Sequence, residues 1–76
     1  MRTETIAKVL HDNLPVEAAA KRIYGYLLTD NGPDEPFNND NALELQELCT
    51  HENYQHGEEL LASIDDICKQ RDKPIV

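Results

Sequence analysis

The chain has 76 residues, which suffice for one small domain (residues 1–76) with a thin margin of stability. Two cysteines are too few for a disulfide framework, and no apolar run approaches the roughly 20 residues that span a membrane. The formal net charge of −8 makes duplex DNA a poor partner, because its phosphate backbone is also negative. The first ten residues lack the apolar segment of a secretion signal, so we expect a cytoplasmic protein with reduced cysteines.

Apolar residues at helical spacing predict a first helix over residues 3–13 and a second over residues 15–28. We expect Thr3 or Thr5 to cap the first helix. Gly25 lies inside the second, where glycine costs about 1 kcal/mol relative to alanine. We therefore expect a neighbouring helix to pack closely against it. The apolar stripes of the two helices are Ile6, Val9, Leu10, Leu14 and Val16, Ala19, Ala20, Ile23, Leu27.

Residues 29–41 are predicted to form an irregular acidic loop, since they contain two prolines, a glycine and four asparagines. Phe37 is the large apolar residue of this loop. We expect it to fasten the loop to the core, and the alternative is an anchor for a partner protein.

Asn41 and Glu44 match a capping box, which predicts a third helix over residues 41–50. A fourth helix is predicted over residues 53–71. The polar stretch 50–57 leaves open whether these two helices are separate or continuous.

The sequence thus predicts an all-α fold, a small bundle of three or four helices. A domain of this size often gains stability from a second subunit. The main stripes leave several apolar side chains without an obvious place in the core, so we expect self-association, most simply as a dimer. These side chains belong to Leu28, Leu43 and either Tyr24 or Tyr26.

The charge is unevenly distributed along the chain. The 46 positions between Arg22 and Lys69 contain no Lys or Arg but eleven carboxylates, whereas residues 1–22 and 69–76 carry +1 and +2. Solvated helix faces explain acidic residues, but ordinary surfaces mix both signs of charge. We therefore expect a non-catalytic protein–protein interaction module that inhibits or modulates a protein with a basic surface, including one that normally binds nucleic acid. The expected partner-binding residues are Asp30, Asp34, Glu35, Phe37, Asp40, Glu44, Glu47, Glu58 and Glu59.

Cys49, His51, His56 and Cys68 are the residue types that bind tetrahedral zinc. Their spacing matches none of the usual zinc knuckles, and both cysteines fall on apolar stripes, where a thiol behaves as a small hydrophobic group. We expect core cysteines, surface histidines, no bound metal and no cofactor.

The sequence contains no Gly-rich phosphate loop, no nucleophile elbow and no HExxH motif, so no enzymatic activity is predicted. One alternative is a small oligomeric binder of a nucleotide or metabolite, with Lys21, Arg22, Tyr24 and Tyr26 around the ligand. Another is a helix-turn-helix-like regulator built from residues 4–28, although such motifs normally have a more basic setting.

In size and charge the chain is similar to small acidic helical inhibitors. These include nucleic-acid mimics of phages and mobile elements, nuclease immunity proteins and some antitoxins. The likeness involves no family motif, so it implies a class of function and assigns no residue a role.

Overall fold

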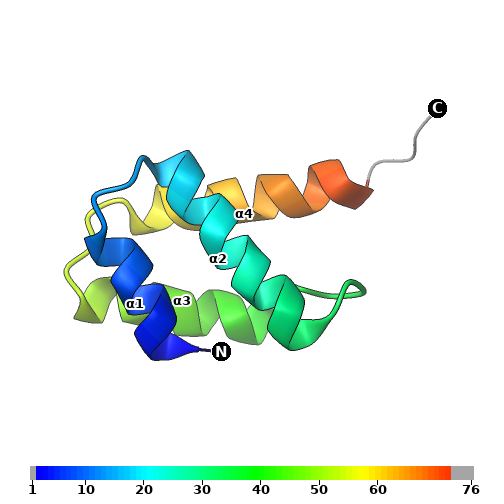
Figure 1. The fold of residues 1–76 in the computed structure, drawn as a ribbon, viewed down its shortest axis with the longest axis horizontal. Helices are drawn as coiled ribbons and strands as arrows, with labels where there is room; N and C mark the ends of the chain where they lie inside the picture. The colour runs from blue at the N-terminus through cyan, green and yellow to red at the C-terminus, as the bar shows by residue number, and fades with distance from the viewer. Residues whose placement is uncertain (1, 73–76) are drawn as a thin grey trace.

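The computed structural model describes residues 2–72, and within them it contains four helices and no strand (Figure 1). The predicted all-α bundle is confirmed. The helices are α1 (Thr3–His11), α2 (Val16–Asn31), α3 (Asn39–His51) and α4 (Gly57–Asp72).

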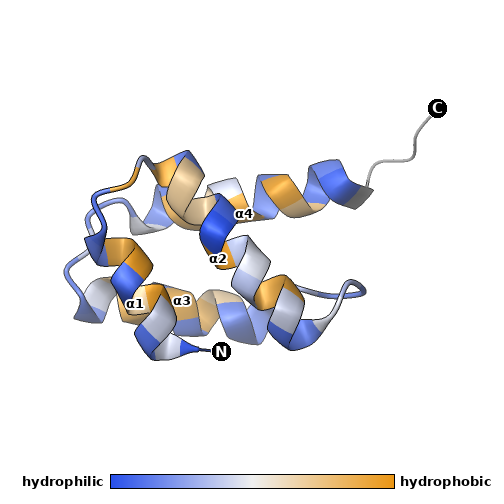
Figure 2. Ribbon diagram, viewed as in Figure 1, coloured by the Kyte–Doolittle hydropathy of each residue, from blue (hydrophilic) through white to orange (hydrophobic). Residues whose placement is uncertain are grey.

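Helix α2 runs obliquely across the bundle, and α1 lies in front of α3 (Figure 1). Helix α2 packs against α1 and α4, and α3 packs against the same two helices. Figure 2 shows apolar and hydrophilic residues alternating around the helices, as amphipathic packing requires. All four helices contribute to one core, formed by Ile6, Val9, Leu10, Ala19, Ala20, Ile23, Leu27, Leu45, Leu48, Cys49, Leu60 and Ile64.

The irregular loop between α2 and α3 is shorter at both ends than predicted and spans residues 32–38. Helix α2 continues through residues 29–31, and the Thr29 hydroxyl donates a hydrogen bond to the Gly25 carbonyl (3.0 Å). Gly32 ends the helix with a φ of 84°, a left-handed conformation that glycine adopts without strain.

The predicted caps are wrong at both α1 and α3. Arg2 precedes α1 and makes no capping hydrogen bond, while Thr3 and Thr5 both lie inside that helix. Asn38, rather than Asn41, caps α3: its side-chain oxygen accepts a hydrogen bond from the Asn41 backbone N–H (2.9 Å). Asn41 is the third residue of the helix, and its side-chain oxygen accepts a hydrogen bond from the Asn38 backbone N–H (3.4 Å). The capping box therefore begins three residues earlier than the sequence indicated.

The open question about residues 50–57 is resolved as a break between α3 and α4. Asn53 has a φ of 57°, and the Tyr54 N–H turns back to the Cys49 carbonyl (2.8 Å). Gly57 then starts α4 close to α3: a Cβ at this position would lie 3.1 Å from the Cys49 Cβ.

The apolar residues that suggested a dimer are partly accommodated within one chain. Tyr24 and Tyr26 pack against the core, Leu28 is half-buried and Leu43 is exposed. Self-association therefore stays a prediction, which light scattering on a size-exclusion column tests.

The expectation of close packing at Gly25 is wrong, because no atom lies within 4 Å of a Cβ built there. Gly25→Ala should therefore raise the free energy of unfolding by about 0.5–1 kcal/mol, since alanine restricts the unfolded chain and favours helix. Urea denaturation measures the change. Gly57→Ala is the matched control and should gain less, because its Cβ would press on Cys49. A loss of stability in Gly25→Ala, or a larger gain at Gly57, would contradict the packing described.

Candidate protein-interaction surface

The eleven carboxylates of the segment without Lys or Arg lie almost entirely on the surface. Only Glu52 is half-buried, and the other ten residues are exposed. The side chains that the sequence singled out for partner binding are thus accessible, with Phe37 as the exception. Phe37 is half-buried and packs against the core, which fastens the loop as expected.

Two of the eleven carboxylates are neutralised by cations from the ends of the chain. Arg2 Nε lies 3.1 Å from Asp30 Oδ1, and Lys69 Nζ lies 3.0 Å from Asp65 Oδ2. The hydrogen bond that Lys69 donates to Asp65, together with the negative charge of that carboxylate, raises the pKa of Lys69. Within residues 2–72, no Lys or Arg pairs with the carboxylates of Asp34, Glu35, Asp40, Glu44, Glu47, Glu58, Glu59 or Asp66.

Helix α3 carries three of these unpaired carboxylates on one outward face. Asp40, Glu44 and Glu47 recur at spacings of four and three residues, which places them on successive turns of the same side. Leu43 lies beside them with 59% of its surface exposed. Asp34 and Glu35, in the loop before α3, are exposed as well.

A small hydrogen-bond network holds the loop against the helices on either side. The side-chain amide of Asn31, at the end of α2, donates to the Pro36 carbonyl and to Asn41 Oδ1, both at 2.9 Å. Asn41 is only 6% exposed, so its amide is a buried polar group with its acceptor satisfied. The sequence did not identify this network, because it joins residues ten positions apart whose proximity depends on the tertiary fold.

The remaining predicted partner-binding residues lie apart from the α3 face. Asp30 is near the end of α2, paired with Arg2. Glu58 and Glu59 lie in the first turn of α4, where the helix dipole interacts favourably with negative charge. His56 Nδ1 lies 3.7 Å from Glu59 Oε2. The loop and α3 therefore form the main group of carboxylates without a Lys or Arg partner within residues 2–72, and the start of α4 forms a second.

The candidate zinc ligands are not brought together. In the part of the chain that the structure describes, no group of three or more His, Cys, Asp or Glu residues could hold a metal ion. Cys49 is buried, and this burial raises the pKa of its thiol, which favours the protonated form. His11, which the sequence did not single out, instead contacts Glu52, with 2.9 Å between Nε2 and Oε1.

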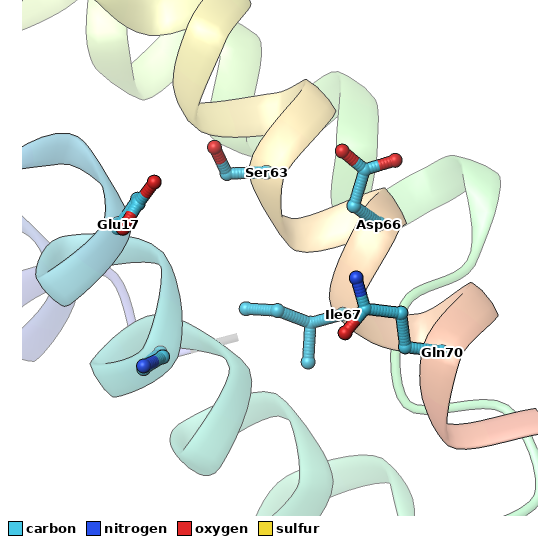
Figure 3. Close-up of a pocket in the computed structure, with 6 residues that line it drawn as sticks. Glu17, Ser63, Asp66, Ile67 and Gln70 are labelled. Carbon is cyan, nitrogen blue, oxygen red and sulfur yellow. The ribbon is translucent and has the colours of Figure 1, made fainter.

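A groove lies between α2 and α4, with Glu17 on one side and Ser63 and Asp66 on the other (Figure 3). Lys21, one of the residues of the small-ligand alternative, also lines it. The groove has a volume of about 280 Å³. Arg22, Tyr24 and Tyr26 do not line it, and the Tyr24 hydroxyl accepts a hydrogen bond from Arg71 Nη1 (3.1 Å). The four residues thus do not all line this groove. The groove is lined by Glu17, Lys21, Ser63, Asp66, Ile67 and Gln70.

Comparison of the chain with protein-family models, with curated proteins and with solved structures found no match. None of the helices within residues 2–72 has both the length and the apolar character needed to cross a membrane.

Proposed function

We propose that this protein is a non-catalytic binding protein that inhibits or modulates a second protein with a basic surface. The observation that carries the proposal is the row of exposed carboxylates on the loop and α3, which lack Lys or Arg partners within residues 2–72. Like charges held close together repel one another, and a cationic partner relieves that repulsion. The same field accelerates encounter with a basic surface and disfavours acidic partners.

The natural target is a protein whose basic surface binds nucleic acid. Asp40, Glu44 and Glu47 are separated along the α3 axis by about 6 Å and about 4.5 Å, from the helical rise per residue. These intervals are of the same order as the about 3.4 Å per charge along one DNA strand. A surface that binds successive phosphates could therefore bind this row of carboxylates, and the protein would compete with nucleic acid.

The proposal is tested by identifying the partner and then removing charge. Affinity capture from the native host or its prey, followed by mass spectrometry, should recover a protein with a basic surface. Asp34→Asn, Glu35→Gln, Asp40→Asn and Glu44→Gln combined should then slow association roughly ten-fold and flatten its salt dependence, since steering contributes about 10- to 1,000-fold to association rates.

The control for this experiment is Lys21→Gln with Arg22→Gln, which leaves the acidic surface intact. We expect it to change the association rate little. If capture recovers no protein while a small molecule copurifies, the proposal fails and the small-ligand alternative takes its place.

A further inference from the structure

We propose that the outward face of α3 docks a basic amphipathic helix of the partner protein. Leu43 supplies the apolar anchor, and Asp40, Glu44 and Glu47 pair with Lys or Arg side chains beside it. This inference rests on the proposed function. It specifies the part of the acidic surface that contacts the partner as one face of α3.

Leu43 is the first observation behind this docking face. It is the one large hydrophobic residue that is exposed in the described part of the chain, at 59%. Its position distinguishes it from an ordinary surface leucine. Asp40 lies one turn before it and Glu47 one turn after it, so an apolar side chain is bordered by carboxylates along the helix.

The relief of the surface around Glu47 is the second observation. One open hollow of about 470 Å³ lies toward α1, and another of about 420 Å³ follows the second half of α3. Glu47 borders both. Lys and Arg side chains place their hydrocarbon stems along such surfaces while the charged ends reach outward to a carboxylate. Thr3, Glu44, Leu48 and His51 complete the first hollow, and Gln46, Thr50 and His51 complete the second.

Charge and shape together select the occupant. Helix α3 has 13 residues, a length of about 20 Å, and a second helix packs on such a ridge by matching its own side-chain rows. A second copy of this chain would bring its own Asp40, Glu44 and Glu47 against these, and nucleic acid or an anionic membrane would be repelled in the same way. A helix with leucines on one stripe and lysines on its flanks complements both the anchor and the carboxylates.

The test uses a synthetic helical peptide of Leu and Lys, with leucines at helical spacing, titrated into the isotope-labelled protein. Amide chemical shifts should change mainly within residues 39–51 of α3. Glu44→Gln with Glu47→Gln should weaken binding at least about five-fold, as expected for contacting charges. Asp65→Asn with Asp66→Asn removes the same formal charge from α4 and should weaken it less than about two-fold.

Leu43→Ala separates the anchor from the charges. The substitution should weaken binding of the Leu/Lys peptide but leave binding of a Lys/Ser peptide of equal charge unchanged. Leu43 is exposed, and circular dichroism will establish that the variant stays folded. Equal weakening by the two double variants, or shifts spread over all four helices, would overturn the docking face and leave the proposed function standing. If neither cationic peptide binds at low salt, the result would count against both the docking face and the proposed function.

Discussion

Leu45→Ala should lower the free energy of unfolding by about 3 kcal/mol, within the roughly 2–5 kcal/mol that such core truncations cost. Leu45 is fully buried on α3, and its removal leaves a cavity among residues of the other helices. A domain of 76 residues has a total stability of roughly 4–11 kcal/mol. The substitution would therefore remove a large part of the stability, and thermal and urea denaturation would both show it.

The control lies two positions away on the same helix. Leu43→Ala makes the identical chemical change at a residue that is 59% exposed, so the free energy of unfolding should change by less than about 0.5 kcal/mol. Equal losses at the two positions would mean that α3 does not present its faces as described.

Asn41→Ala should lower the free energy of unfolding by roughly 2 kcal/mol, because it removes the acceptor shared by two donors in a buried setting. The donors are the Asn31 side-chain amide, 2.9 Å from Asn41 Oδ1, and the Asn38 backbone N–H, at 3.4 Å. Both donors would lose a partner, whereas the bond from the Asn41 backbone N–H to Asn38 Oδ1 would remain. Urea denaturation measures the loss, and Asn39→Ala, at an exposed neighbour, should cost much less.

A double-mutant cycle separates this network from a general effect of truncating asparagine. Asn31→Ala and Asn41→Ala each break the same hydrogen bond, so the double variant should lose less stability than the two single variants together. Additive losses would show that the two amides do not act as one unit.

The fold could be predicted because its signals are local. Apolar residues at spacings of three and four mark the buried side of each helix, and the expected stripe residues Ile6, Ile23 and Leu27 are all fully buried. The ends of helices were harder. Asn38 and Asn41 are both good capping residues, and the structure shows Asn38 as the cap, while the Asn41 side chain accepts a hydrogen bond from Asn31 of α2. That contact exists only in the assembled bundle.

Helix proximity was the other feature that local pattern could not predict. Gly25, in the middle of a helix, suggested a close crossing but faces open space, whereas Gly57, at the start of α4, lies against Cys49. A glycine marks a backbone that tolerates close approach, and only the tertiary structure determines whether anything approaches.

The candidate surface was predictable in its exposure but not in its pairing. Carboxylates without nearby cations in the sequence were expected to lie on the surface, and ten of the eleven do. The sequence indicated no partner for Asp30 or Glu52, because Arg2 and His11 reach them from distant positions. These pairs therefore leave fewer carboxylates without a partner, and most of the carboxylates that lack a Lys or Arg partner lie on the loop and α3.

The stretch without Lys or Arg also determines how the protein responds to trypsin, which cleaves after those two residues. The bonds that flank this stretch follow Arg22 and Lys69, and both lie inside helices, α2 and α4. Helical bonds are cleaved only when the helix opens, so trypsin would report the opening of α2 and α4. Trypsin would not detect motion of the loop or α3, because neither contains a Lys or Arg. Both would be recovered in a single fragment, residues 23–69.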